Sequence, residues 1–452
     1  MKRNCLGLLA GLALVVAGAP AQAAQCTNMS ALVVPGAEYQ VANCFDDLST
    51  TYLVAMGRTD ASDWATLHSQ RTRNPSGAVP GIQIDGYFPD SSTSNGTYGL
   101  NHDAQFVIRL PDHWNGKLVI TGAPGIRKQY ANDYLFSDWL IARGYAYAST
   151  DKGNNGTNFH RDGATPGDAL VEWNNRVTEL TLATKAVVQQ RYGQPAAYTY
   201  ITGISNGGYL TRHALENRPD LYDGGVDWEG AHWRPEGPNL FTFLPAALKH
   251  YPRYAATGDR AAYDAMIAAG FAPGSEFLWD YHYAVYWDLT QRTYREEMDP
   301  GYDGSIEAGI PFCASGTPYC DADYLYSARP QAVKDAVAKV ALTGRIEKPM
   351  ITLHGTLDTL LPIGPNSDAY VALIEQAKRS KLHRYYVVEG GNHVDQLYDE
   401  HPDKLRPIAP CHRAAFIALE KWVEGKGKKA EPPPSRFISR PGSGDLANEC
   451  SL

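Results

Sequence analysis

The chain has 452 residues, of which 44% are hydrophobic and 20% are charged, and it carries a formal net charge of −8 at pH 7. Such a composition is typical of a globular protein, and the length leaves room for a large core in two or three domains. The acidic balance argues against nucleic acid or an anionic membrane as a partner.

Residues 1–23 have the pattern of a secretory signal peptide. Lys2 and Arg3 precede an apolar run at residues 6–17, and Ala21-Gln22-Ala23 supplies the small residues of a cleavage site. The apolar run is too short to cross a bilayer, and no later stretch reaches about 18 unbroken apolar residues. We therefore expect an exported protein, secreted or periplasmic, without a membrane partner.

Six of the seven cysteines follow this leader. An even number in an exported chain suggests three disulfides, for which fifteen connectivities exist. The sequence contains no C-x-x-C pair, which makes a zinc site a weak hypothesis. Pairing of near neighbours predicts the bridges Cys26–Cys44, Cys313–Cys320 and Cys411–Cys450.

In chain order, residues 26–100 predict an irregular segment of strands and loops, and strands and helices then alternate. The strands are expected at residues 104–110, 117–121, 145–150, 198–202, 225–228, 349–354 and 384–389. The helices are expected at residues 132–143, 169–192, 209–217, 366–378 and 410–423. This alternation predicts an α/β fold, with a mostly parallel sheet covered by helices on both faces.

The alternation breaks in the middle of the chain, where tryptophans and tyrosines are frequent. We interpret residues 227–345 as an inserted lid or cap domain, called the lid segment below. The sequence thus predicts one α/β domain formed by residues 24–226 and 346–452.

The strongest local motif is G-x-S-x-G, formed by Gly203, Ser205 and Gly207 between a predicted strand and a predicted helix. In this context the motif is typical of a nucleophile elbow, in which a strained turn exposes the serine hydroxyl. The glycines on either side let the strand and the helix pass closely. The alternative is a glycine-rich structural turn.

A serine nucleophile needs a histidine base and a carboxylate that orients it, and in such folds they follow in the order Ser, acid, His. Asp358 follows the strand predicted at 349–354, and His393 follows the strand at 384–389. All three residues would lie at the carboxyl edge of the sheet, where open α/β sheets place their sites.

Other residues compete for these roles. Asp358 could cap a turn, and His393 could be an ordinary loop histidine. The rival bases are His354, His383, His401 and His412, and the rival acids are Asp395 and Asp399. We rank these lower because the histidines sit inside predicted elements or in distal loops, and because the aspartates are too near His393 in sequence.

An oxyanion hole needs two donors aimed at the developing charge. The sequence suggests the backbone N–H groups of Asn206, after the nucleophile, and of Ala123, in the loop after the strand at 117–121. That loop could instead be a simple turn. Aromatic and polar residues after the strand at 225–228 could contact substrate or belong to the core of the lid segment: Trp228, Glu229, His232 and Trp233.

Several stretches together resemble the tannase and feruloyl esterase family of α/β-hydrolases. They are WNGKLVITGAPG, LIARGYAYASTDKGNN, RVTELTLATKAVVQQRYGQPAAYTYITGISNGGY, RPDLYDGGV, PMITLHGTLDTLLP and VVEGGNHVD. The resemblance implies an exported serine esterase of the α/β-hydrolase fold with a lid before the acid strand. It supports Ser205, Asp358 and His393 position by position. The family commonly bridges two cysteines beside the nucleophile and the histidine, where this chain has Ile204 and Val394.

The family's lid often holds calcium with a run of aspartates, which Asp299 and Asp303 match only in part. Structural calcium is therefore one hypothesis, and an ordinary Asp-Gly turn is the other. We expect no required cofactor. The expected reaction is hydrolysis of small or oligomeric carboxylic esters through an acyl-enzyme, on aromatic (feruloyl, galloyl or terephthaloyl) or hydroxyalkanoate esters. The alternatives are a peptidase or amidase with the same triad, and a catalytically silent binding module. The oligomeric state is not predicted.

Overall fold

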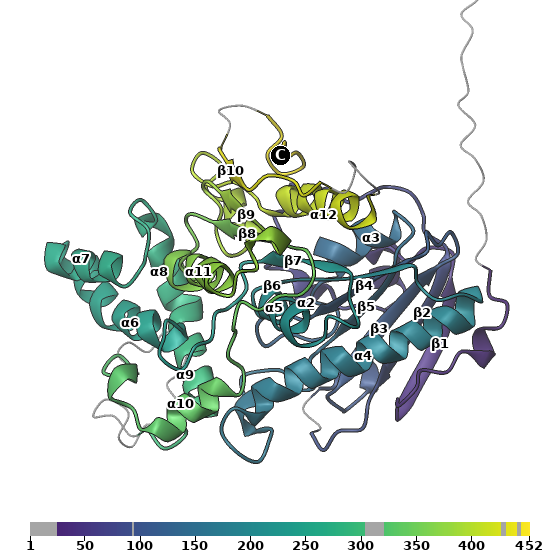
Figure 1. The fold of residues 1–452 in the computed structure, drawn as a ribbon, viewed down its shortest axis with the longest axis horizontal. Coiled ribbons are helices and arrows are strands. Elements are labelled where there is room, and N and C mark those ends of the chain that lie inside the picture. The colour runs from purple at the N-terminus through teal and green to yellow at the C-terminus, as the bar shows by residue number, and fades with distance from the viewer. Residues whose placement is uncertain (1–24, 93–94, 303–320, 426–430, 441–443) are drawn as a thin grey trace, which may run out of the picture.

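The computed structural model describes residues 25–92, 95–302, 321–425, 431–440 and 444–452. Within these residues one ten-stranded sheet runs through the molecule in the order β1-β2-β3-β5-β4-β6-β7-β8-β9-β10 (Figure 1). The strands β1, β2, β3 and β5 pair antiparallel, and all further pairs from β5 to β10 are parallel. The bounds are β1 Tyr39–Phe45, β2 Gly81–Tyr87, β3 Gln105–Pro111, β4 Lys117–Gly122, β5 Ala146–Thr150, β6 Tyr198–Ile204, β7 Gly224–Trp228, β8 Met350–Gly355, β9 His383–Val388 and β10 Arg436–Ile438.

Helices cover both faces of the sheet, as the alternation of elements predicts. Leu118 and Ile120 of β4 pack into the core with α4 and α5, whereas Val119 between them packs with α3 and α12. This is the two-residue period of a strand whose faces are both buried. Figure 1 shows α4 and α5 below the sheet and α3 and α12 above it. The helices of this part are α1 Thr50–Ala55, α2 Ala61–Trp64, α3 Asp138–Ile141, α4 Asp168–Tyr192, α5 Asn206–Asn217, α11 Ala369–Gln376 and α12 Ala409–Glu424.

The chain between β7 and β8 contains only helices as regular elements among its described residues. They are α6 Leu240–Thr257, α7 Arg260–Ala268, α8 Trp279–His282, α9 Asp288–Met298 and α10 Gln331–Ala338. Figure 1 shows this group beside one end of the sheet. Trp233, Trp279 and Trp287 are fully buried in its core. Its status as a separate domain, with the bounds 227–345, stays a prediction.

Two expected elements differ in the structure. The segment before residue 100 contains strands, as expected, but β1 and β2 join the central sheet as two antiparallel strands and make the segment more regular than expected. Gly86 within β2 weakens the strand signal, and a Cβ there would lie 2.3 Å from the Tyr39 carbonyl oxygen. The helix expected at 132–143 contains a π-helical turn followed by the short α3, because Asn132 donates its amide to Thr121 and Gly122 instead of capping a helix.

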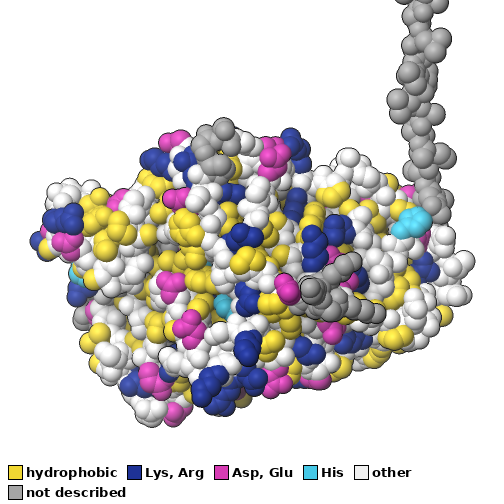
Figure 2. All heavy atoms as spheres, turned by 45° about the horizontal axis from the view of Figure 1, so that its top comes forward, with side chains coloured by type: hydrophobic (Ala, Val, Ile, Leu, Met, Phe, Trp, Pro, Cys, Tyr) yellow, Lys and Arg dark blue, Asp and Glu magenta, His cyan; other side chains and the backbone are white. Residues whose placement is uncertain are grey.

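Two of the three predicted disulfides are confirmed, Cys26–Cys44 and Cys411–Cys450. Cys313, Cys320 and the expected signal peptide lie outside the described residues. Among the helices that the structure does describe, none has both the length and the apolar character needed to cross a bilayer. On the face drawn in Figure 2, basic and acidic side chains are interspersed.

Candidate active site

Ser205 occupies the turn between β6 and α5, with a positive φ of 60° and ψ of −118°. A side chain in this conformation is strained, and the close packing around it holds the turn. A Cβ at Gly203 would lie 2.4 Å from the Gly207 backbone, and a Cβ at Gly207 would lie 2.7 Å from the Gly122 carbonyl oxygen. Only glycines therefore permit this turn, as the G-x-S-x-G motif predicts for a nucleophile elbow.

A second close backbone contact brings together the loops that carry Asp358 and His393. Gly355 ends β8 three residues before Asp358, and Gly391 follows β9 two residues before His393. A Cβ at Gly355 would lie 2.3 Å from the Gly391 backbone, and a Cβ at Gly391 would lie 2.7 Å from the Gly355 Cα. The two loops can touch at this point only because both positions lack side chains.

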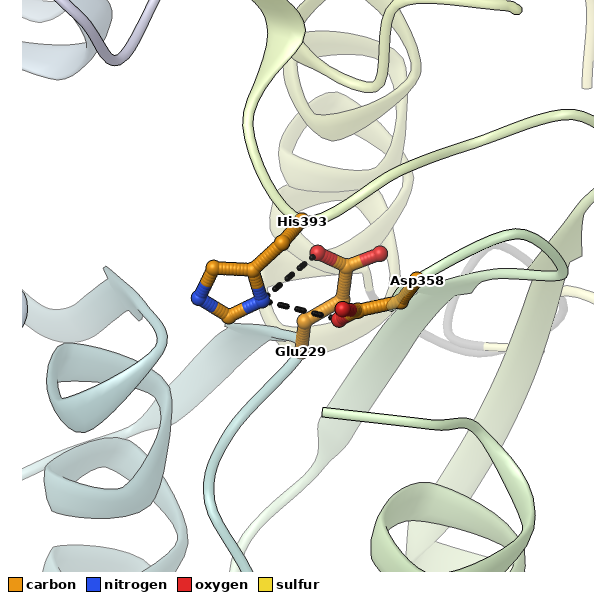
Figure 3. A group of neighbouring side chains, drawn as sticks. All are labelled: Glu229, Asp358 and His393. Atoms are coloured by element: carbon orange, nitrogen blue, oxygen red, sulfur yellow. Dashed lines mark hydrogen bonds and ion pairs between the residues drawn. The ribbon is translucent and has the colours of Figure 1, made fainter. Parts of the chain in front are cut away.

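The structure brings Asp358 and His393 into direct contact (Figure 3). His393 Nδ1 lies 2.8 Å from Asp358 Oδ2, while the backbone N–H groups of Leu360 and Leu361 each donate to Oδ1 at 2.8 Å. Burial alone would raise the pKa of Asp358, but His393 and His354 more than offset it, and the pKa lies below its usual range. Asp358 is thus ionised, and it fixes the proton of the imidazole on Nδ1.

One cavity of about 280 Å³ joins the nucleophile to the base. Both Ser205, which is 9% exposed, and His393, which is 4% exposed, line it. In Figure 3, Nε2 of His393 points away from both carboxyl groups, which leaves this nitrogen for the reacting side. The aliphatic part of the wall is formed by Leu67, Ile126, Leu240, Leu289, Leu360 and Leu361.

The four residues expected at the pocket after β7 do not line this cavity. Trp228 packs in the sheet core against Phe136, and Trp233 packs in the lid segment against Phe241. His232 is fully buried, and burial lowers its pKa to about 3. Glu229 Oε2 lies 3.6 Å from His393 Nδ1, outside the cavity wall. The expected pocket contacts are therefore not seen, because all four side chains are buried in the core.

The prediction that the Ala123 N–H is an oxyanion donor is also wrong. Its N–H donates to the Thr150 carbonyl oxygen at 3.0 Å, which continues the pairing of β4 with β5 past the end of the strand. Gly125, two residues later, lines the cavity, and its carbonyl accepts a hydrogen bond from Asn206 Nδ2 at 3.0 Å. Asn206 itself also lines the cavity.

Among the cavity residues that sequence reasoning missed are Tyr294 and Arg127. Tyr294 of α9 accepts a hydrogen bond from Asn206 Nδ2 at 2.5 Å, and thereby connects the lid segment to the nucleophile turn. Arg127 follows the loop after β4 and donates to the Asp63 carbonyl and the Thr66 hydroxyl, both at 2.5 Å. No motif marks Tyr294, whereas Arg127 lies within the loop that the sequence assigns to the site.

The calcium hypothesis gains no support from Asp299. Its carboxylate accepts hydrogen bonds from Arg329 Nε at 2.6 Å and from the Tyr324 hydroxyl at 3.0 Å. An arginine supplies the positive charge that a calcium ion would supply. Asp303 lies outside the described residues, and the hypothesis stays untested.

Comparisons with known proteins match two separate parts of the chain to different families. Residues 94–227 match the family "Tannase and feruloyl esterase", and residues 313–449 match the family "3HB-oligomer hydrolase". A probable feruloyl esterase of Arthroderma benhamiae is 32% identical over 125 residues, covering 26% of this chain and 23% of the relative. A mono(2-hydroxyethyl) terephthalate hydrolase of Piscinibacter sakaiensis is 28% identical over 142 residues, covering 28% and 24%. The alignments therefore span about a quarter of these relatives.

Solved structures match over most of the chain. Feruloyl esterase B from Aspergillus oryzae superposes with a TM-score of 0.55 at 13% identity, covering 92% of each chain. Tannin acyl hydrolase from Aspergillus niger superposes with a TM-score of 0.50 at 14% identity, covering 89% of this chain and 87% of the other. The sheet order and the elbow define an α/β-hydrolase fold. Within this fold, residues 94–227 are similar in sequence to the tannase and feruloyl esterase family.

We predict that Gly391→Ala damages both stability and activity. The added methyl group would meet the Gly355 backbone and the Ile408 side chain, and overpacking of this kind costs about 1–3 kcal/mol of unfolding free energy. It would also displace His393, two residues later, and lower turnover. Denaturant unfolding and ester hydrolysis measure the two effects.

Gly77→Ala is the matched control, because nothing lies within 4 Å of a Cβ at this position. It should leave both quantities unchanged. If Gly391→Ala behaved like Gly77→Ala, the contact between the two loops would not hold the site together.

Proposed function

We propose that this protein is a serine hydrolase of carboxylic esters, with Ser205 as nucleophile, His393 as base and Asp358 as the orienting acid. The observation that carries the proposal is that Ser205, in its strained turn, and His393, held by Asp358, line one cavity. The names of the relatives and structural neighbours, which are esterases and ester hydrolases, agree with this chemistry.

In the first half of the reaction, the Ser205 hydroxyl attacks the acyl carbon while His393 Nε2 accepts its proton. Asp358 holds the imidazole and offsets the charge that it gains. The imidazolium then donates the proton to the leaving alcohol, and an acyl-enzyme remains. In the second half, His393 activates a water molecule that hydrolyses the acyl-enzyme and restores the serine.

The oxyanion needs two donors that are free before the reaction. The N–H of Asn206, at the start of α5, is one of them, and the helix N-terminus adds its positive partial charge. For the second donor we replace Ala123 with Gly125, whose N–H donates to no protein acceptor in the described chain. The Asn206 side chain orients this peptide through its bond to the Gly125 carbonyl oxygen.

The cavity favours a compact acyl group. Its volume of about 280 Å³ lies at the small end of ligand cavities, which run from about 300 to 1,000 Å³. The aliphatic wall suits an aromatic ring or a short hydroxyalkanoyl group. These are the acyl groups of feruloyl, galloyl, terephthaloyl and hydroxyalkanoate esters. A panel of methyl ferulate, methyl gallate, hydroxybutyrate dimers and terephthalate monoesters would rank them.

We also propose that the protein is exported. Residues 1–23 have the signal-peptide pattern, and the disulfides Cys26–Cys44 and Cys411–Cys450 are typical of an oxidising compartment.

Replacement of the nucleophile tests the proposed function. Ser205→Ala should lose about three or more orders of magnitude in turnover of p-nitrophenyl esters, with the fold retained by circular dichroism. Ser275→Ala, which removes a buried hydroxyl of the lid segment outside the cavity, should retain turnover. Full activity in Ser205→Ala would exclude this nucleophile, and faster cleavage of anilides than of matched esters would indicate an amidase.

A second prediction concerns the charge of the substrate. Among the described residues of the cavity wall, Arg127 is the one with a permanent positive charge. Arg127→Gln should therefore lower kcat/KM for terephthalate monoesters about tenfold or more, the effect of losing one charge-assisted hydrogen bond. Hydrolysis of dimethyl terephthalate should change little.

Lys128→Gln is the matched control, because it removes the adjacent positive charge outside the cavity wall. It should leave the ratio of monoester to diester hydrolysis unchanged. An equal change of this ratio in both variants would indicate long-range electrostatics and not a contact with the substrate carboxylate.

A further inference from the structure

Glu229 is a carboxyl group at the active site that the proposed mechanism does not use. It follows β7, is fully buried, and does not line the cavity. Its Oε2 lies 3.6 Å from His393 Nδ1, the same nitrogen that Asp358 contacts at 2.8 Å. Figure 3 shows the two carboxyl groups side by side on the Nδ1 edge of the imidazole, from two neighbouring strands of the sheet.

The structure holds Glu229 firmly in this place. Its backbone has a positive φ of 50°, and its N–H donates to the Leu353 carbonyl oxygen of β8 at 2.9 Å. The Gly355 N–H donates to Oε1 at 2.7 Å, and Trp228 Nε1 lies 3.3 Å from Oε2. Non-glycine residues with a positive φ occur frequently at functional sites.

We propose that Glu229 is a second positioning acid for His393, which shares the Nδ1 edge of the imidazole with Asp358. This inference rests on the proposed function, because it assigns Glu229 a role in orienting that base. Glu229 acts through His393 and touches no substrate. Its carboxyl lies 3.6 Å from Nδ1, where it adds a second negative charge when it ionises.

The charges around Glu229 determine when it ionises. Burial and the neighbouring Asp358 carboxylate hold the pKa of Glu229 well above its ordinary value, and Asp395 raises it further. The facing titratable groups are Asp358 from the loop after β8, and His393 and Asp395 from the loop after β9. His354 of β8 and His282 of α8 act on the site through Asp358.

Of the two carboxyls, Asp358 therefore loses its proton first as the pH rises, and Glu229 keeps its proton to a higher pH than an ordinary glutamate. As the pH rises, Glu229 loses its proton and a second negative charge appears beside the imidazole. This charge stabilises the imidazolium that forms in the transition state. The turnover number should thus rise with pH as Glu229 ionises, with little change in KM because Glu229 lies outside the cavity.

The test uses Glu229→Gln, Asp358→Asn and the double variant, with kcat and KM for a p-nitrophenyl ester measured across the pH range in which the protein stays folded. Glu229→Gln should remove the rise in kcat that accompanies ionisation of Glu229. In Asp358→Asn the neighbouring charge is absent, so Glu229 ionises more readily and becomes the only acid on Nδ1. Adding Glu229→Gln there should lower the residual kcat about tenfold, a coupling typical of residues in contact.

Glu297→Gln is the matched control. Glu297 is another buried glutamate, which accepts a hydrogen bond from the Ala169 N–H at 3.0 Å on α4. Burial also raises its pKa, to about 8. This variant should keep the pH profile of the unmodified enzyme. The role of Glu229 is overturned if Glu229→Gln keeps that profile too and if the single and double Asp358 variants have equal turnover at every pH.

A measurement on the unmodified protein covers the case in which a variant does not fold. The downfield Nδ1–H proton resonance of His393, assigned by its loss in His393→Ala, should shift through a titration step when Glu229 ionises, and this step should be absent in Glu229→Gln. A resonance without such a step also overturns the proposal. If the unmodified protein hydrolyses esters through Ser205 and either result is negative, only the role of Glu229 fails and the proposed function stands.

Discussion

The site depends on two places where backbone touches backbone at the carboxyl edge of the sheet. Gly203, Gly207 and Gly122 let β6, α5 and the end of β4 meet around Ser205. Gly355 and Gly391 let the loops after β8 and β9 meet, so that Asp358 reaches His393. Parallel strands end at one edge, but side chains would keep the loops several ångströms apart. Because these positions are glycines, the loops that share this edge can touch one another.

The lid segment adds a second layer of constraint on the same groups. Tyr294 accepts a hydrogen bond from Asn206, next to the nucleophile. His282 and Trp287 both bond to Thr359, next to the orienting acid. Movement of the lid segment would therefore displace groups next to both Ser205 and Asp358. The lid segment lines part of the cavity, and it also holds groups beside the residues that would react there.

The elbow and the order of Ser205, Asp358 and His393 could be predicted because they depend on local rules. A strand followed by G-x-S-x-G, and polar residues directly after strand ends, are visible in the sequence. The Ala123 donor was wrong because one extra hydrogen bond between Ala123 and β5 cannot be predicted from residue types. Trp228 and Trp233 were misplaced because aromatic residues after a strand fit a core and a pocket equally well. The position of Glu229 beside His393 could not be predicted, because it depends on a positive φ at Glu229 and on contacts between loops that are distant in sequence.

The central claim is that Ser205 is a nucleophile activated by His393. The most direct measurement is labelling with a fluorophosphonate, followed by peptide mapping by mass spectrometry. The account predicts one label per chain, on Ser205, and strongly slowed labelling in His393→Ala. Absence of labelling in folded protein, or a label on another residue, would contradict it.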